Sequence, residues 1–178
     1  MLIKIKKFFC LVYKFTILFP LWKSGHKSFT SKYIKYLRKL GINIKKPYYI
    51  DLTVWFDPAN YKMIEIGNSV VISKDVRFLV HDYSICRGIE ALGRNMKREY
   101  RYEDKIIIGN NVFIGLGVTL LPGTYIGDNC IIGTGSVVKG KYDNNSVIIG
   151  NPAKVVADTK DWAYNKIEKS EILKEYII

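Results

Sequence analysis

The chain has 178 residues, of which 48% are hydrophobic and 25% charged, and its formal net charge at pH 7 is +12. This length supports one compact domain with its own core, and no second domain is expected. The three cysteines (Cys10, Cys86 and Cys130) are an odd number without a CxxC pair, which favours neither a disulfide framework nor a zinc site and makes a reducing compartment the default.

Residues 1–47 form a basic, aromatic segment that carries the whole charge imbalance. They hold twelve Lys and Arg and no acid, whereas residues 48–178 hold sixteen of each sign. Cations interleaved with aromatic rings are typical of a surface that lies on anionic headgroups. We therefore expect residues 1–30 to make peripheral contact with the inner face of the membrane, in an otherwise cytoplasmic protein. The alternative is a helical face that packs its rings on the protein.

The same segment fits a membrane span or a signal peptide less well. The apolar run from Phe8 to Trp22 has fifteen residues and contains Lys14 and Pro20, whereas a span needs about twenty. Lysines precede the run, as in a signal peptide, but no clean small-x-small cleavage site follows. No nucleic-acid motif accompanies the cations, so nucleic acid is not an expected partner.

The pattern predicts a helix from Ser31 to Leu40. Ser31 or Thr30 caps its start, apolar residues recur at helical spacing, and Gly41 ends it. We expect this helix to cover the first coil of the fold that follows. Residues 48–65 fit that fold only loosely, since Pro58 and Asn60 interrupt the pattern.

A six-residue repeat dominates the rest of the chain. Its large apolar anchors fall on multiples of six, namely Ile66, Ile72, Phe78, Ile108, Ile114, Leu120, Ile126, Ile132 and Val138. The residue after the anchor is often glycine, and the fourth after it is small or β-branched (Val70, Val76, Val112, Val118, Thr124, Cys130 and Ser136). Neither a helical period nor simple alternation produces this pattern.

Short repeats of this kind predict an all-β fold, a parallel β-helix in which three hexads make one coil. The anchors fill the axis, and glycine or Asn (Asn68, Asn110, Asn111 and Asn129) is expected to adopt left-handed conformations at the corners. A β-sandwich would have to explain six uninterrupted repeats from 108 to 143. We expect the β-helix to span residues 48–156, with an amphipathic helix in 157–178 that caps the exposed edge of the last coil.

The repeat stops after His81, Asp82 and Tyr83, and it resumes only at Ile106. A flat-sided prism has no pocket of its own, so a protruding loop over 84–105 is a natural place for a site. Histidine suits proton transfer at cellular pH, and we expect His81 to act as general base. The alternative is a histidine that only satisfies turn hydrogen bonds. Asp82 is expected to orient the imidazole or to bind hydroxyl groups of the molecule whose proton His81 removes.

The stretch IIIGNNVFIGLGVTLLPGTYIGDNCIIGTGSVV (106–138), followed by Gly150-Asn-Pro-Ala-Lys154, resembles the left-handed β-helix (hexapeptide-repeat) acyltransferases, in particular the sugar O-acetyltransferases of the maltose, galactoside and polysaccharide type. The resemblance covers about residues 48–156. It implies acetyl-CoA as acyl donor, no metal, and a homotrimer with active sites between subunits. It also implies that a histidine near the loop removes the proton of the acceptor.

The resemblance implies further site residues. The Val112-Phe113-Ile114-Gly115 motif places the oxyanion-binding amide on Leu116, with Phe113 as an apolar wall where the family commonly has Trp. The residues expected to bind CoA are Gly115, Gly133, Thr134, Gly135, Lys139, Pro152 and Lys154. In the loop, Tyr83 and Arg87 are expected to contact the acceptor together with Asp82.

The expected function is transfer of an acetyl group from acetyl-CoA to a sugar hydroxyl of a cell-surface polysaccharide or its precursor. Serine and nucleotide-amino-sugar acetyltransferases remain open, because the same base serves a hydroxyl or an amine. A non-catalytic β-helix scaffold is the alternative from another class. A γ-type carbonic anhydrase is excluded, since it needs three histidines and the chain has two.

Overall fold

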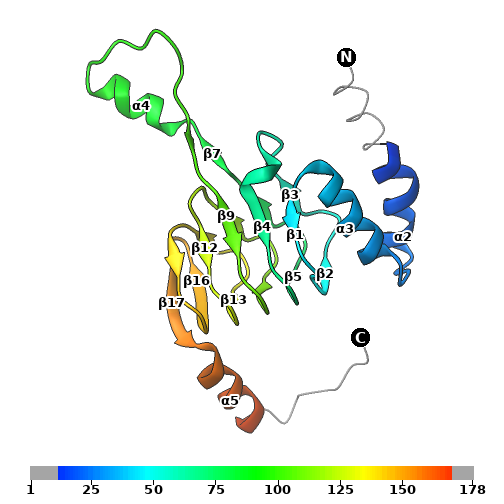
Figure 1. Ribbon diagram of the computed structural model, residues 1–178. Coiled ribbons are helices and arrows are strands. Elements are labelled where there is room, and N and C mark those ends of the chain that lie inside the picture. The colour runs from blue at the N-terminus through cyan, green and yellow to red at the C-terminus, as the bar shows by residue number, and fades with distance from the viewer. Residues whose placement is uncertain (1–11, 170–178) are drawn as a thin grey trace.

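The computed structural model describes residues 12–169, and the parts of the expected N-terminal segment and C-terminal helix that fall in 1–11 and 170–178 lie outside the described residues. Short strands wind into a stack of coils with helices at both ends and one projecting arm (Figure 1). Successive strands join three different parallel sheets in turn, and each strand pairs with the strand one coil away. That order describes a three-sided solenoid.

Each of the three sheets forms one side of the solenoid. Sheet A contains β1 (Asn43–Ile44), β4 (Ile64–Ile66), β9 (Ile106–Ile108), β12 (Tyr125–Ile126) and β15 (Lys141–Tyr142). Sheet B contains β2 (Tyr49–Ile50), β5 (Val71–Ile72), β10 (Phe113–Ile114), β13 (Ile131–Ile132), β16 (Ser146–Gly150) and β17 (Ala153–Asp158). Sheet C contains β3 (Trp55–Phe56), β6 (Arg77–Phe78), β11 (Thr119–Leu120) and β14 (Val137–Val138). The first strand lies at Asn43, five residues before the start expected from the repeat.

The pairing register confirms the hexad reading and locates its interruptions. Ile108 pairs with Ile126, eighteen residues further along the chain, as three hexads require. The first two coils are twenty-two residues apart, since Ile44 pairs with Ile66, and the second and third are forty-two apart, since Ile66 pairs with Ile108. Both insertions follow a strand of sheet C, so both leave the solenoid at the same edge.

The repeat anchors form the core. All nine are at most 2% exposed, and the small residues of the repeat, from Val70 to Ser136, are at most 1% exposed. The hydroxyls of Thr124 and Ser136 donate to the carbonyls of Leu121 and Gly133, which satisfies these polar groups inside the solenoid. Cys130 is buried, as expected for a core position.

The edge between sheets A and B, here called the AB edge, consists of residues 67–70, 109–112, 127–130 and 143–146 and the preceding turn 45–48. Side-chain amides form a ladder along it: Asn111 donates to Asn129 (2.9 Å), and Asn129 donates to Asn145 (3.1 Å). Asn111 and Asn129 have φ of 53° and 58°, as predicted. Asn68 and Asn110 are not left-handed; instead the Asn68 amides donate to Asn110, and Ser69 and Asn145 take the left-handed positions.

Glycine after an anchor has a different cause from the one the sequence indicated. Gly109 does not have positive φ, but a Cβ there would lie 2.8 Å from the carbonyl of Gly127 on the next coil. The small residue is needed because adjacent coils approach each other closely.

Helices cover the N-terminal end of the solenoid. Helix α3 (Phe29–Leu40) ends at Gly41, whose φ is 110°, and buries Phe29, Tyr33 and Leu37. This confirms the predicted helix, its end and its position over the first coil. The predicted start was wrong: the helix begins two residues before Ser31, and its N-cap is Ser28, not Ser31 or Thr30. It follows a π-helical turn η1 (Lys14–Leu18) and the short helix α2 (Phe19–Lys23). A 3-10 turn, η2 (Tyr61–Met63), occupies the first insertion.

The C-terminal end differs from the expected capping helix. Strand β17 folds back antiparallel onto β16 and covers the last edge of sheet B. Helix α5 (Thr159–Lys169) follows, but it extends away from the solenoid (Figure 1) and none of its described side chains is buried. A strand covers a sheet edge by pairing with its free N–H and C=O groups.

Candidate active site

The edge between sheets C and A, here called the CA edge, consists of residues 57–63, 79–105, 121–124 and 139–140. Its large insertion is an arm: β7 (His81–Asp82) pairs antiparallel with β8 (Tyr102–Glu103), and helix α4 (Ser84–Ala91) stands beyond them, away from the solenoid (Figure 1). Cys86 fastens the arm internally, since its thiol contacts the backbone of Tyr100. The predicted loop is therefore a two-stranded ribbon with a helix at its tip.

His81 lies at the root of this arm, next to a buried carboxylate. Its Nδ1 is 2.5 Å from Oδ2 of Asp57, which belongs to the first coil and is buried. Asp57 also accepts from the backbone N–H groups of Ala59 (2.9 Å) and Val80 (3.1 Å). Three donors therefore converge on one carboxylate, which holds it rigidly.

This contact fixes the imidazole. An ionised carboxylate only accepts, so in a neutral imidazole this contact favours the proton on Nδ1 and leaves the lone pair of Nε2 free. The His81 side chain is 25% exposed, so it is not enclosed by its own chain. The arrangement is that of a general base held in one tautomer by a second group.

Asp82, the sequence candidate for that second group, has another partner. Its carboxylate accepts from the backbone N–H (2.7 Å) and the hydroxyl (2.9 Å) of Ser84 at the start of α4. These bonds hold the pKa of Asp82 below its usual range against a small opposing effect of burial, and the charge of Lys139 lowers it a little further. Asp82 thus fastens the arm, while Asp57 orients the imidazole.

Tyr83 stands beside the base. Its ring meets the His81 ring edge-on, with 5.4 Å between centroids, and it is 44% exposed. Arg101, across the ribbon, shares a hydrogen bond with Tyr83 and an ion pair with Glu103. Arg87 lies out on α4, where it pairs with Glu90 at 2.9 Å.

The edge between sheets B and C, here called the BC edge, consists of residues 51–53, 73–75, 115–117, 133–135 and 149–152. Leu116 is here, and its carbonyl accepts from Gly135 of the next coil. Nothing lies within 4 Å of the Cβ positions of Gly117 and Gly135, so main chain is open to a ligand there. Gly115 is different: a Cβ would lie 2.7 Å from the Thr134 N–H group.

The remaining expected CoA residues divide between two edges. Gly133 packs against Ile149, Pro152 lies at the turn into β17, at the C-terminal end of the BC edge, and Lys154 is in β17, paired with Ile149. Phe113 projects from sheet B and is 44% exposed. Lys139, by contrast, is on the CA edge near Asp82. One chain therefore does not bring His81 and Leu116 together, because they lie on different edges of the prism.

The main residue that sequence reasoning missed is Asp57. It precedes His81 by twenty-four residues, close to the spacing of the first two coils. An acid at the first broken corner, one coil before a histidine at the second, is the signal that could have found it.

In residues 12–169 no cluster of His, Cys, Asp or Glu has an arrangement that could hold a metal ion. Over the same range, none of the helices combines the length and the apolar character that crossing a bilayer requires.

Comparisons with known proteins show what the chain is similar to. The family Bacterial transferase hexapeptide (six repeats) matches residues 105–140. A putative lipopolysaccharide biosynthesis O-acetyl transferase, WbbJ of Escherichia coli (strain K12), is 32% identical over 58% of this chain and 57% of its own length. Galactoside O-acetyltransferase of the same organism is 35% identical over 55% of this chain and 45% of its own length. The chain thus spans about half the length of these relatives.

A solved galactoside acetyltransferase in complex with coenzyme A has the same fold, with a TM-score of 0.56 and 24% identity over 90% of this chain and 84% of that one. Its likeness extends over the solenoid and beyond the matched repeats. Together with the register of the coils, it shows that this chain has the fold of that enzyme, and its repeats are similar to those of the hexapeptide transferases.

Proposed function

We propose that this protein transfers an acetyl group from acetyl-CoA to a sugar hydroxyl of a cell-surface polysaccharide or its precursor. The observation that carries the proposal is the His81 imidazole, held by buried Asp57 and partly open at the root of the arm. A scaffold needs neither a fixed tautomer nor a buried carboxylate beneath it. The similarity to the lipopolysaccharide and galactoside O-acetyltransferases supports a sugar hydroxyl as acceptor. The left-handed sense of the solenoid is part of the same proposal.

In this mechanism Nε2 of His81 removes the acceptor's hydroxyl proton as its oxygen attacks the thioester carbonyl. Nδ1 keeps its proton, and Asp57 stabilises the imidazolium that forms. The Leu116 N–H donates to the oxygen that becomes negative. When the C–S bond breaks, the imidazolium returns its proton to the CoA sulfur, and the ester remains on the sugar.

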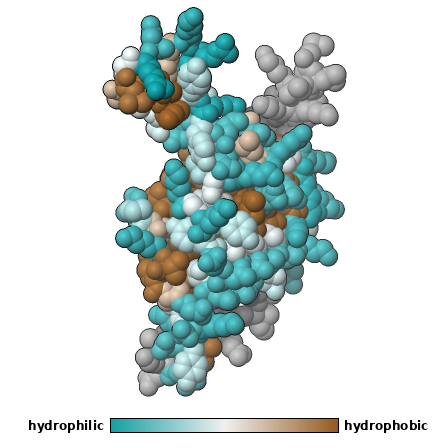
Figure 2. Space-filling model, turned by 60° about the vertical axis from the view of Figure 1, so that its left-hand side comes forward, coloured by the Kyte–Doolittle hydropathy of each residue, from teal (hydrophilic) through white to brown (hydrophobic). Residues whose placement is uncertain are grey.

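The site requires more than one copy of the chain. His81 is on the CA edge and Leu116 on the BC edge, and a flat sheet separates the two edges. A three-fold assembly that places one chain's CA edge against its neighbour's BC edge unites them, which supports a homotrimer. The solenoid and arm also expose apolar surface for such contacts (Figure 2), including Phe113, Ile149 and Val155 on sheet B and Ile85 and Leu92 on the arm.

Acetyl-CoA fits the BC edge of the neighbour. The open main chain at Gly117 and Gly135 allows the pantetheine arm a close approach. In this proposal Gly115, Gly133 and Thr134 line its path, Pro152 contacts adenine, and Lys139 and Lys154 meet the phosphates. Tyr83, Arg87 and Phe113 border the acceptor. Asp82 is the weakest of the expected acceptor ligands, because both its oxygens bind Ser84.

The test is release of CoA thiol from acetyl-CoA in the presence of a panel of mono- and oligosaccharides, serine and amino sugars. His81→Ala should lower the rate by roughly 10²- to 10⁴-fold. His26→Ala is the matched control, since His26 lies in the N-terminal turn and contacts Ser28, and its rate should equal that of wild type. An unchanged rate in His81→Ala would remove the base from the mechanism. Folded trimers that acetylate none of the acceptors would support the scaffold instead.

A lipid-linked precursor as acceptor would place the enzyme at the inner membrane face. The expected contact through residues 1–30 belongs to this proposal, and it is separable from the chemistry, because the helices concerned lie at the N-terminal end of the solenoid (Figure 1).

A further inference from the structure

The segment from Val12 through η1 and α2 contains apolar residues that pack on the protein and others that are exposed. Leu18 is fully buried, and Leu21 and Trp22 pack against the core. Val12, Phe15 and Phe19 of the same segment are 38%, 62% and 45% exposed, and the Phe19 ring lies 5.8 Å from the Trp22 ring. An apolar ridge of this kind in a charged segment calls for an apolar partner.

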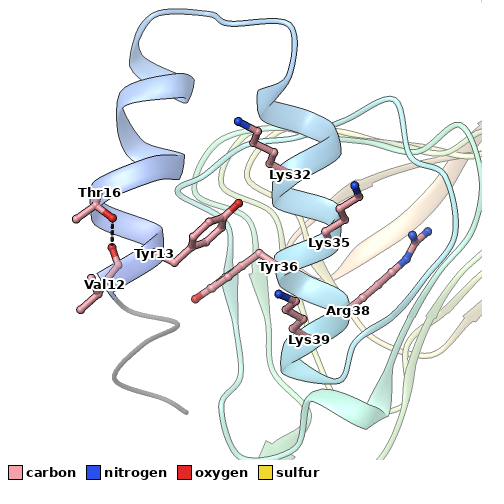
Figure 3. A pocket seen from close by; sticks show the side chains of 8 residues that line it. All are labelled: Val12, Tyr13, Thr16, Lys32, Lys35, Tyr36, Arg38 and Lys39. Atoms are coloured by element: carbon pink, nitrogen blue, oxygen red, sulfur yellow. Dashed lines mark hydrogen bonds between the residues drawn. The ribbon is translucent and has the colours of Figure 1, made fainter. Parts of the chain in front are cut away.

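A groove of about 670 Å³ lies between residues 12–16 and helix α3 (Figure 3), and Val12 of the ridge is among its lining residues. Its floor is apolar and aromatic: the rings of Tyr13 and Tyr36 face each other across it with 6.2 Å between centroids. Its α3 side carries four cations, Lys32, Lys35, Arg38 and Lys39.

Three of these cations are available to a ligand. Arg38 is committed to the protein, since its guanidinium donates to the carbonyls of Ile44 (2.9 Å) and Lys45 (2.5 Å). Within residues 12–169, Lys32, Lys35 and Lys39 form no ion pair, and no acidic residue occurs in the sequence before Asp51. The groove therefore combines uncompensated positive charge with an apolar floor.

We propose that the groove and the ridge of Val12, Phe15 and Phe19 together form a docking surface for an anionic phospholipid bilayer. The phosphates would meet Lys32, Lys35 and Lys39, and the ridge would enter the headgroup layer. A second copy of the chain is a poor occupant, because symmetric contact would bring like charges together without an acid to offset them. The inference goes beyond acetyl transfer and gives the membrane placement proposed above a defined surface.

The surface is fixed relative to the solenoid. Trp22 Nε1 donates to Asp51 on the first coil at 3.2 Å, and the Lys74 ammonium lies 6.0 Å from the Trp22 ring centre. A bilayer bound here would therefore hold the solenoid by its N-terminal end, with the CA edge and its arm to the side.

The experiment is sedimentation of the full chain with vesicles of phosphatidylcholine, with and without phosphatidylglycerol. Wild type should bind the anionic vesicles and lose most of that binding at high salt. Each lysine near the surface contributes about fivefold, so Lys32→Gln with Lys35→Gln and Lys39→Gln should weaken binding on the order of a hundredfold. The matched control neutralises Lys97, Lys160 and Lys166, three exposed lysines elsewhere, and should bind like wild type. Phe15→Ser with Phe19→Ser should weaken binding even at low salt.

Several results would overturn the proposal. Full binding by the Lys32, Lys35 and Lys39 variant would assign attachment to other cations, such as Lys4, Lys6 and Lys7. If millimolar inorganic phosphate alone abolishes vesicle binding, the three lysines form a site for free phosphate and not for a bilayer. A change of oligomeric state in the Phe15 and Phe19 variant without vesicles would identify the ridge as a protein interface. Circular dichroism establishes that each variant is folded, and thiol release is measured separately, so failure of docking and failure of acetyl transfer are distinguishable.

Discussion

The AB and CA edges belong to the same coils, but they use polar side chains in opposite ways. Along the AB edge Asn111, Asn129 and Asn145 hydrogen-bond to one another at regular coil spacing. Along the CA edge the coils are interrupted twice, and Asp57 and His81 face each other across the interruptions. The Asn amides of the ladder hydrogen-bond to one another and stabilise the stack. The pair of buried Asp57 and partly exposed His81 leaves Nε2 of the imidazole available to a ligand.

The largest effect should come from the CA edge. Asp57→Asn keeps the shape of the side chain but replaces one carboxylate oxygen with an NH₂ group, which cannot accept the Nδ1 proton of His81, and it removes the charge that stabilises the imidazolium. We expect kcat to fall roughly 10²- to 10⁴-fold, with KM for acetyl-CoA near wild type because buried Asp57 acts through His81 and is not among the residues expected to bind acetyl-CoA. Asp82→Asn is the matched comparison, measured in the same thiol-release assay. A greater loss in Asp82→Asn than in Asp57→Asn would reverse the roles assigned to the two acids.

Substitutions at the AB edge should lower the free energy of unfolding and should not affect acetyl transfer directly. Gly109→Ala places a Cβ against the main chain of Gly127, and overpacking of this kind costs about 1–3 kcal/mol. Urea unfolding should show the loss. Gly88→Ala is the control, since Gly88 is in helix α4 with open space around it, and it should be neutral or stabilising by up to ~1 kcal/mol. Equal stability of the two variants would mean that the coils can separate without cost.

A smaller effect separates backbone strain from the amide ladder. Asn111 has φ of 53° and donates to Asn129. Asn111→Ala loses the hydrogen bond and strains the backbone, and it should cost about 1–2 kcal/mol, whereas Asn111→Gly removes only the bond and should cost about half of that. Thermal unfolding measures both. If glycine costs as much as alanine, the ladder alone accounts for the preference for Asn.

The smallest expected effect is the loss of thermal stability at low pH that Asp51, on the BC edge, causes. Asp51 is 1% exposed; burial raises the pKa of its carboxyl, but hydrogen bonds from Thr53, Tyr49 and Trp22 outweigh this and leave the pKa below its usual range. A lowered pKa means that the stabilisation is present above the unfolded-state value of about 3.9 and is lost as the pH falls through the folded-state value. The Tm of Asp51→Asn should therefore decrease less than that of wild type between pH 5 and pH 3.

Trp22→Phe is the companion variant for this acid effect. It keeps the Asp51 charge but loses the Nε1–H donor, which should lower the free energy of unfolding by about 1 kcal/mol. If wild type and Asp51→Asn lose Tm in parallel over this pH range, Asp51 does not contribute to acid sensitivity.

The sequence by itself determined the solenoid, since the hexad period assigns an inward position to each anchor, and it also determined helix α3 and its end at Gly41. It located the arm, because a repeat shows its own interruptions. It gave the wrong cap at the C-terminal end, where apolar residues in α5 remain exposed and β17 covers the sheet edge instead.

Only the tertiary structure decided the partner of His81. Sequence reasoning favoured Asp82 because it is adjacent, but neighbouring side chains on a strand point to opposite faces, and Asp82 binds Ser84. Asp57 is brought beneath His81 by the stacking of two coils whose spacing is irregular. The repeat period specifies which residues face inward. Contacts between the irregular corners depend on where the two insertions lie in the folded solenoid, so only the tertiary structure reveals them.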